Sequence, residues 1–397
     1  MKNNFRFPPE IAHILHTFTQ SGFSCYAVGG CVRDALLGKT PYDYDLCTSA
    51  LPEETRSLFP KTVPTGMAHG TVTVFYGGQS AEVTTFRREG SYTDHRRPDE
   101  VLYTKSLEED LARRDFTMNA MAMDEHYRLY DPYGGRQDLQ QGIIRCVGDP
   151  DRRFREDALR MFRGMRFSAQ LGFPIEQATL EAMGRQAEFC SFVAPERLRV
   201  ELEKTLLSPR PQVLEQVIAL GMLKAYIDPA VPVSLAHLAA LPAEAHLRYG
   251  ALTYAMYLAG SIREPKAFLK ALRLDNGTVD AVTKGIEIAE SAPVWDDVSV
   301  KRLLQRYGEE ALRCAAACGD YEAISAATTR VLMSGEPYAL KHLAVTGRDL
   351  QALGITGTAV GKVLHKLLDA VICNPGCNTR DLLLTLSEKE KPDESES

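Results

Sequence analysis

Residues 26–45 read YAVGGCVRDALLGKTPYDYD and contain two patterns around which the rest of the chain is organised. A short apolar run over residues 25–28 predicts a strand, and apolar residues at helical spacing follow the pair Gly29 and Gly30. Backbone N–H groups at such a turn, together with the positive end of a helix, are suited to hold a phosphate. The stretch therefore predicts a strand, a phosphate-binding turn and the start of a helix.

Two carboxylates, Asp43 and Asp45, alternate with tyrosines a dozen residues after the turn. In a strand, residues i and i+2 point to the same side, so we expect both carboxylates to converge on one point and to attract Mg²⁺. An Asp-x-Asp pattern alone is at least as often a solvated strand end. A phosphate-binding turn beside a carboxylate pair is what metal-assisted phosphoryl transfer requires. Glu82, which opens a later strand, is left open as a third carboxylate or an ordinary polar strand residue.

The combination resembles the opening motif of the nucleotidyltransferase superfamily, in the branch of class II tRNA nucleotidyltransferases (CCA-adding enzymes) and bacterial poly(A) polymerases. The matching residues are Gly29-Gly30-x-Val32-Arg33-Asp34 followed by Asp43-x-Asp45. The resemblance implies that Asp43 and Asp45 are catalytic and hold Mg²⁺. It also implies that Gly30 and Arg33 bind the nucleotide.

A second motif lies in residues 110–122, a stretch whose pattern predicts a helix with a polar and an apolar side. Arg113-Arg114-Asp115-x-x-x-Asn119-Ala120 resembles the family motif whose Arg and Asp meet the ribose hydroxyls. A guanidinium and a carboxylate are suitable partners for a 2′-OH, which is both donor and acceptor. A surface ion pair is the common alternative for an adjacent Arg and Asp. The resemblance implies that Arg114 and Asp115 bind ATP or CTP.

Residues 89–103 have no periodicity, carry both charge signs and contain a single proline, which predicts an exposed, mobile loop. Such loops are usually solvated connections. This one resembles the flexible loop of CCA-adding enzymes, which their CC-adding relatives lack. The match includes Asp94, Arg96, Arg97 and Pro98.

The pattern turns helical at residue 151 and carries a charged stripe, Arg153, Asp157, Arg160, Arg163 and Arg166. A basic stripe is normally a solvated face. Within it, Asp157 and Arg160 stand at i and i+3 on the expected helix and would present an acceptor beside a donor. Adenine and cytosine offer an amine beside a ring nitrogen, so the pair would select A and C and reject G and U. The resemblance implies that Arg163 and Arg166 also bind the nucleotide.

Apolar residues recur at helical spacing from about residue 207 onward, without a strand signal. The predicted fold class is α+β, with an N-terminal nucleotidyltransferase head containing a mixed β-sheet and then an all-helical neck, body and tail. The expected domains are a catalytic head (1–146), a base-recognition neck (147–206), a body (207–330) and a tRNA-binding tail (331–397). The tail carries a glycine-rich stretch that resembles one in CCA-adding enzymes, and an acidic end that we expect to be disordered.

The composition of the chain bears on its binding to nucleic acid, on the state of its cysteines and on its location. The 397 residues carry a net charge of −6, which argues against indiscriminate coating of nucleic acid, although basic residues cluster at 87–88, 96–97, 113–114 and 152–166. Nine irregularly spaced cysteines fit reduced thiols better than a disulfide framework. No apolar run approaches a membrane span and the N-terminus lacks a hydrophobic signal core, so we expect a cytoplasmic protein.

The motifs together predict template-independent addition of C, C and A to the 3′ end of tRNA from CTP and ATP, with release of pyrophosphate, by in-line transfer with two Mg²⁺ ions. A poly(A) polymerase or an A-adding tRNA nucleotidyltransferase is the alternative, against which stand the acidic composition and the lack of a basic C-terminal extension. A non-catalytic tRNA-binding module would have lost its carboxylates, and a small-molecule nucleotidyltransferase would not need so long a helical body. Expected partners are the tRNA 3′ end, ATP and CTP, with no membrane; a homodimer is left open.

Overall fold

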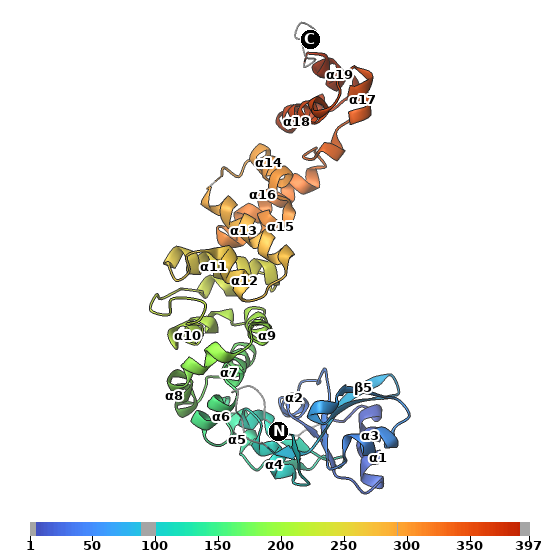
Figure 1. Cartoon of the computed structure of the whole chain (residues 1–397), viewed down its shortest axis with the longest axis vertical. Coiled ribbons are helices and arrows are strands. Elements are labelled where there is room, and N and C mark those ends of the chain that lie inside the picture. Colours follow the sequence, from blue (N-terminus) through green and yellow to red (C-terminus); the bar gives the residue numbers. More distant parts are fainter. Residues whose placement is uncertain (1–4, 89–100, 292, 390–397) are drawn as a thin grey trace. The chain divides into compact units, whose positions relative to one another are not determined.

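The computed structural model describes residues 5–88, 101–291 and 293–389 (Figure 1). The chain divides into two compact units, Met1–Pro232 and Val233–Ser397. The first contains a β-sheet followed by helices, and the described part of the second contains helices and no strand. This confirms the predicted α+β class. The finer division at residues 146, 206 and 330 stays a prediction.

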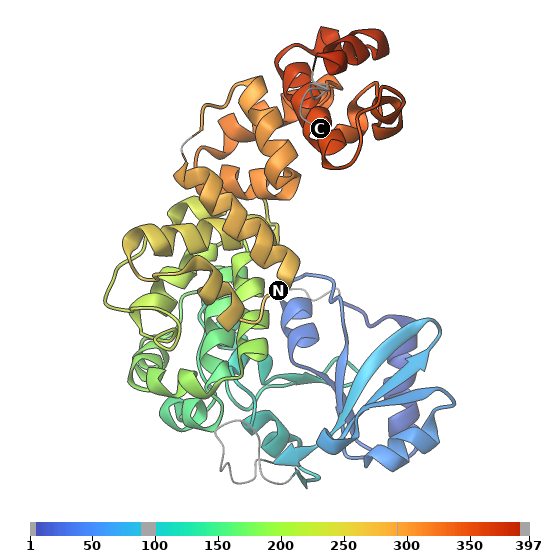
Figure 2. The same cartoon turned by 45° about the horizontal axis from the view of Figure 1, so that its top comes forward.

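A seven-stranded sheet forms the centre of the head, with strand order β3-β4-β5-β2-β1-β8-β9 (Figure 2). Its strands are β1 (Cys25–Val28), β2 (Asp45–Thr48), β3 (Thr62–Gly66), β4 (Thr71–Tyr76), β5 (Gln79–Thr85), β8 (Ala122–Met123) and β9 (Leu129–Tyr130). Strands β2 and β5 pair in parallel, whereas the other neighbours pair antiparallel, so the sheet is mixed as predicted. Two further strands, β6 (Arg87–Arg88) and β7 (Leu102–Tyr103), pair with each other.

Ten α-helices belong to the described part of the first unit: α1 (Pro9–Gln20), α2 (Gly30–Leu36), α3 (Pro52–Leu58), α4 (Leu107–Ala112), α5 (Gly135–Gln141), α6 (Pro150–Glu156), α7 (Leu159–Leu171), α8 (Gln177–Arg185), α9 (Pro195–Leu206) and α10 (Leu214–Ala219). Helix α1 buries its residues at i, i+3, i+4 and i+7, namely Ile11, Ile14, Leu15 and Phe18, as the spacing predicts. Helices α7 and α9 pack against each other. Helix α7 carries Arg160, Arg163 and Arg166 of the charged stripe, and α9 carries residues that bond to the stripe.

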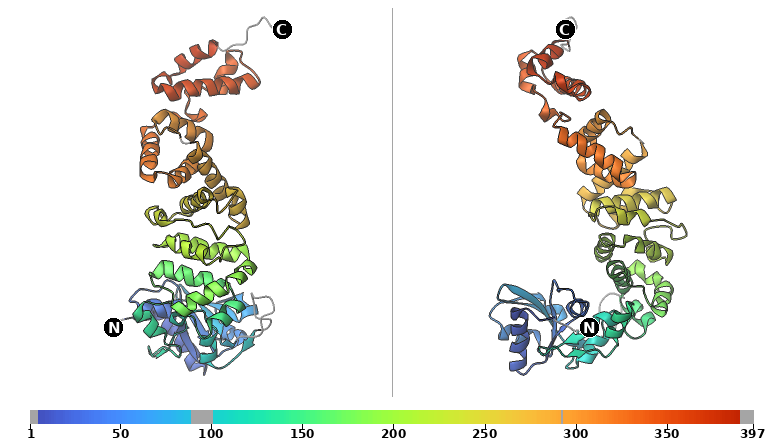
Figure 3. Two further views of the ribbon diagram at one scale, coloured as in Figure 1. Left: turned by 90° about the vertical axis from the view of Figure 1, so that its left-hand side faces the viewer. Right: turned by 180° about the vertical axis from the view of Figure 1, so that it is seen from behind.

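The second unit consists, where described, of α11 (Ala245–Ala259), α12 (Pro265–Ala271), α13 (Asn276–Glu290), α14 (Asp297–Tyr307), α15 (Glu309–Cys318), α16 (Tyr321–Ser334), α17 (Gly347–Ala352), α18 (Thr358–Cys373) and α19 (Arg380–Glu388) (Figure 3). Helices α13 and α15 approach closely because Gly285 lacks a Cβ, which would overlap Cys314. One apolar cluster joins α13 to α16, and another joins α17 to α19. Among the described helices, none is long and apolar enough to cross a membrane.

Two expectations for the head need revision. The helix predicted over residues 110–122 ends at Ala112, and residues 122–123 instead form β8 beside β1. Pairing with the sheet therefore overrides the local helical pattern. Of the predicted loop at 89–103, residues 89–100 lie outside the described residues, and Leu102–Tyr103 forms β7.

Candidate nucleotide-binding site

A cavity of about 710 Å³ lies in the first unit, and residues from each of the sequence motifs line it. Ten of its lining residues are basic: Arg33, Arg87, Arg88, Arg113, Arg114, Arg160, Arg163, Arg166, Arg197 and Lys204. Five are acidic: Asp34, Asp43, Asp45, Asp115 and Asp157. The volume suits a small-molecule ligand, and the excess of positive charge favours an anion even though the whole chain is negative.

The turn between β1 and α2 brings three motifs together. Gly29 has φ of 76° and ψ of −130°, a conformation that residues with side chains rarely adopt. A Cβ at this position would lie 3.3 Å from Nη1 of Arg114 and 4.0 Å from Oδ2 of Asp45. The glycine turn, the ribose motif and the carboxylate pair therefore meet at one place, as predicted.

The two carboxylates line the same cavity but do not share a strand. Asp45 begins β2, whereas Asp43 lies in a bend before it, so the prediction of two strand residues is wrong for Asp43. The register explains this, because the pairing of β2 with β5 begins at Asp45 and Glu82. Burial raises the pKa of Asp45, and the charges of Glu82 and Asp43 raise it further while Arg114 lowers it. Concentrated negative charge of this kind favours a cation.

Glu82 lies opposite Asp45 in the parallel register and is exposed. Within the described ranges, no group of three or more His, Cys, Asp or Glu side chains could hold a metal ion. Glu82 is not among the residues that line the cavity, whereas Asp43 and Asp45 are. A pair of carboxylates is typical of Mg²⁺ sites completed by substrate phosphates and water.

The buried carboxylate of Asp110 holds the guanidinium group of Arg114 in place. Asp110 accepts hydrogen bonds from Nη2 of Arg114 at 3.1 Å and from Nη2 of Arg113 at 2.7 Å. Burial would raise the pKa of Asp110, but these two guanidinium groups hold it below its ordinary value. Nε of Arg114 is buried and has no hydrogen-bond partner among the residues that the structure describes. Asp110 therefore aligns an arginine that borders both Gly29 and Asp45.

Asp115 is held ionised although it is only 8% exposed. Burial opposes its charge, but Nε of Arg163 lies 2.7 Å from its Oδ2, and Asn119 and the N–H of Phe116 donate to its Oδ1. Together these contacts lower the pKa of Asp115 from 3.8 to about 2. Both members of the predicted ribose pair thus line the cavity as charged groups.

The predicted base-reading pair does not lie on one helix. Helix α6 ends at Glu156, Asp157 is extended with φ of −146°, and α7 begins at Leu159. The side chain of Asp157 accepts the N–H of Leu159 at 3.1 Å and Nη2 of Arg197 at 2.9 Å. An aspartate that binds nearby backbone in this way competes with helix continuation, which explains the break.

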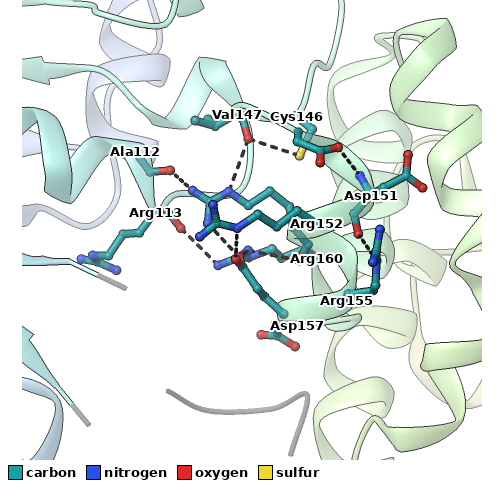
Figure 4. A network of polar contacts seen from close by, with 12 residues as sticks. Ala112, Arg113, Cys146, Val147, Asp151, Arg152, Arg155, Asp157 and Arg160 are labelled. Atoms are coloured by element: carbon teal, nitrogen blue, oxygen red, sulfur yellow. Dashed lines mark hydrogen bonds and ion pairs between the residues drawn. The ribbon is translucent and has the colours of Figure 1, made fainter. Parts of the chain in front are cut away.

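Arg160 is buried and is directed away from Asp157. Its Nη1 donates to the carbonyl of Arg153 and, at 2.9 Å, to Oε2 of Glu156, while its Nη2 donates to the carbonyl of Arg113 at 3.2 Å. Figure 4 shows the Arg160 guanidinium reaching this carbonyl, with the Asp157 carboxylate separate from it. Both residues line the cavity, but each is bonded to other groups.

The other predicted arginines also border the cavity, and hydrogen-bond and aromatic partners hold them there. Arg33 donates Nη1 to Oδ1 of Asn119 at 2.9 Å, and Arg166 donates Nε to Oε2 of Glu201 at 2.6 Å. Phe167 lies under three of the guanidinium groups. Asn119 lies within the second motif and could have been found from it, whereas Phe167 carries no sequence signal for such a contact.

Comparisons with known proteins match most of the chain to one family. Residues 25–145 match the family described as "Poly A polymerase head domain", and residues 172–231 match "Probable RNA and SrmB- binding site of polymerase A". The chain is 39% identical to the CCA-adding enzyme of Geobacillus thermodenitrificans over 335 residues, which cover 83% of this chain and 79% of the relative. It is 35% identical to the CCA-adding enzyme of Geobacillus stearothermophilus over 389 residues, 92% of each chain. The chain belongs to the CCA-adding enzyme family.

A solved structure of a CCA-adding enzyme supports the same assignment over nearly the whole chain. The Bacillus stearothermophilus enzyme in complex with CTP matches with a TM-score of 0.81 and 32% identity, covering 96% of this chain and 98% of that one. The Thermotoga maritima CCA-adding enzyme complexed with tRNA, at 21% identity and a TM-score of 0.67, shares the fold. Members of this family are nucleotidyltransferases, and the chain is one of them.

Proposed function

We propose that the chain adds C, C and A to the 3′ end of tRNA, using CTP and ATP and releasing pyrophosphate. The observation that carries this is the cavity in which the glycine turn, two carboxylates and the arginines meet, in a chain that aligns with a CCA-adding enzyme over 92% of its length. Poly(A) synthesis is not favoured, because the relatives and solved structures compared above are CCA-adding enzymes. A cytoplasmic location is part of the proposal, because that is where tRNA substrates are found.

Asp43 and Asp45 would hold Mg²⁺, which their chemistry fits. Two clustered carboxylates would supply some of the oxygen ligands that Mg²⁺ prefers, and triphosphate oxygens and water would supply the rest. Mg²⁺ at this place would lower the pKa of the tRNA 3′-OH and stabilise the departing pyrophosphate. The protein's own contribution is to position both carboxylates beside the glycine turn.

The remaining side chains would hold the nucleotide in the orientation for in-line attack. The backbone N–H of Gly30 and the guanidinium groups of Arg33, Arg163 and Arg166 would neutralise the triphosphate. Arg114 and Asp115 would meet the ribose, since a cation and an ionised carboxylate satisfy a hydroxyl that both donates and accepts. These roles follow from position, charge and hydrogen-bonding capacity in the cavity.

Asp157 and Arg160 would select the base. Asp157 is already bonded to Leu159 and Arg197, but each carboxylate oxygen can accept a second hydrogen bond, so it can still receive the exocyclic amine of A or C. Arg160 would donate to the adjacent ring nitrogen after its guanidinium turns from its present acceptors. Selection of the base therefore includes a side-chain rearrangement.

The experiment is single-nucleotide incorporation with Mg²⁺ and defined tRNA ends. CTP alone should extend a tRNA lacking CCA by two residues, ATP alone should extend a tRNA ending in CC by one, and UTP and GTP should be used poorly. Asp43→Ala should abolish both additions while tRNA affinity stays nearly unchanged, because other surfaces hold most of the tRNA. If that variant kept more than a few per cent of activity, Asp43 would have no place in the metal site.

A further inference from the structure

Three arginines of the cavity converge on one aromatic ring. Phe167 belongs to α7 and is 4% exposed. The Cζ atoms of Arg166, Arg33 and Arg163 lie 4.1, 5.3 and 5.6 Å from the centre of its ring. All three distances fall within the range of favourable cation–π contact. The arginines come from two helices, α2 and α7, so the ring links two parts of the site.

Each of these guanidinium groups is also held by a carboxylate through the same atom. Nε donates to Asp34 at 2.9 Å in Arg33, to Asp115 at 2.7 Å in Arg163 and to Glu201 at 2.6 Å in Arg166. A guanidinium is planar, so a ring beneath it and a carboxylate at its Nε edge together fix its orientation. In Arg33, Nη1 also donates to Asn119 at 2.9 Å, and in Arg166, Nη1 also donates to Gln170 at 3.0 Å. The Nη edge of Arg163 remains for a ligand.

Arg163 has Nη groups that can bind a ligand. Its side chain is 38% exposed, and within the described residues neither of its Nη groups has a hydrogen-bond acceptor. Three cations around one ring would repel each other, but the negative face of the ring and the three carboxylates offset that repulsion. The cluster therefore keeps three cations close together before any anion binds.

We propose that Phe167 is a positioning residue that orients Arg33, Arg163 and Arg166 toward the triphosphate shared by ATP and CTP. This rests on the proposed function and adds a residue to it. Because the triphosphate is common to both substrates, weakening the ring contact should affect ATP and CTP equally. Choice among bases should not change, since Asp157 and Arg160 contact the base elsewhere in the cavity. If Phe167 only filled the core, a change of ring charge at constant volume would leave the KM of both nucleotides unchanged.

The test replaces Phe167 in the full chain with phenylalanines that carry one, two and three ring fluorines. Fluorine removes electron density from the ring face and hardly changes its volume, so packing is preserved while the cation–π contact weakens. We expect the KM for CTP and for ATP to rise together with each fluorine, reaching roughly threefold to tenfold, with an unchanged melting temperature. The inhibition constant of inorganic tripolyphosphate, which has no base or ribose, should rise by the same factor.

Phe162 provides the matched control, because it lies on the same helix, is 2% exposed and has no cation over its ring among the described residues. Fluorination there should leave all constants unchanged. Constant KM values across the Phe167 series would overturn the proposal, as would a KM change without a change for tripolyphosphate, or an equal response at Phe162. Failure of the proposed function would look different, since the unmodified protein would then add neither C nor A.

Discussion

At the scale of single residues, Gly29 is a position where a small substitution should disturb the site. An alanine there would occupy a backbone conformation with φ of 76° and would bring its Cβ to 3.3 Å from Arg114. We expect Gly29→Ala to cost about 1–2 kcal/mol of stability and to lower kcat/KM for nucleotide addition roughly tenfold to a hundredfold, because Arg114 is displaced.

Gly38 is the control for this substitution. Its φ is 74°, and a Cβ there would meet no atom within 4 Å. Gly38→Ala should therefore lose stability through its positive φ and keep its activity. Thermal melting and steady-state kinetics of the two variants separate the backbone cost from the effect on the site, and equal activity in both would remove Gly29 from the argument.

The lowered pKa of Asp115 makes the free energy of unfolding depend on pH. Its folded-state pKa of about 2 lies below the ordinary 3.8, so its ionisation stabilises the folded protein above the ordinary value and this contribution is lost as the pH falls toward 2. Relative to Asp115→Asn, the wild type should lose about 1 kcal/mol between about pH 6 and about pH 3. Urea unfolding at these pH values measures it. A difference that stays constant or grows on acidification would contradict the assignment.

At the scale of elements, the break between α6 and α7 positions Asp157, the residue that we propose selects the base. Asp157→Ala removes an acceptor, and an unmet polar edge costs about 1 to 3 kcal/mol, so selection of A and C over G and U should weaken roughly tenfold to a hundredfold. Reversal of the pair, Asp157→Arg with Arg160→Asp, should favour G and U if the helices still pack. Competition assays with paired nucleotides measure the ratio, and an unchanged preference in the alanine variant would mean that Asp157 does not read the base.

The segment that resembles the flexible loop of CCA-adding enzymes makes a separate prediction. Deletion of residues 93–100 should allow two C additions and stop before the A, because the resemblance makes this segment the feature that separates CCA addition from CC addition. Gel analysis of the products with CTP and ATP together reports the stopping point. Equal loss of C and A addition would show that the segment supports the fold or the triphosphate instead.

The sequence predicts elements well where local pattern and tertiary structure agree. The strand, turn and helix around Gly29 are confirmed, and α1 buries the four apolar residues that its spacing predicts. The break at Asp157 was not predictable from helical spacing, because it depends on the Asp157 side chain, which accepts the backbone N–H of Leu159. Arg197 of α9, forty residues later, donates to the same carboxylate. The role of Phe167 was equally hidden, since only the folded chain brings α2 next to its ring.

At the scale of the whole molecule, the net charge of the chain and the charge of its cavity have opposite signs. The chain carries −6 overall, yet its cavity is lined by ten basic and five acidic residues. In a chain of net negative charge, a strongly positive cavity concentrates anionic ligands at that place. This suits an enzyme that must engage one end of one kind of RNA, and it is unfavourable for gripping arbitrary RNA along its length.

The most direct test of the account is to sequence the 3′ ends produced from a tRNA lacking CCA when Mg²⁺ and all four nucleoside triphosphates are present in equal amounts. The account predicts one dominant product that ends in CCA and does not grow further. A run of A residues of varying length, or addition of A without the preceding two C residues, would contradict it.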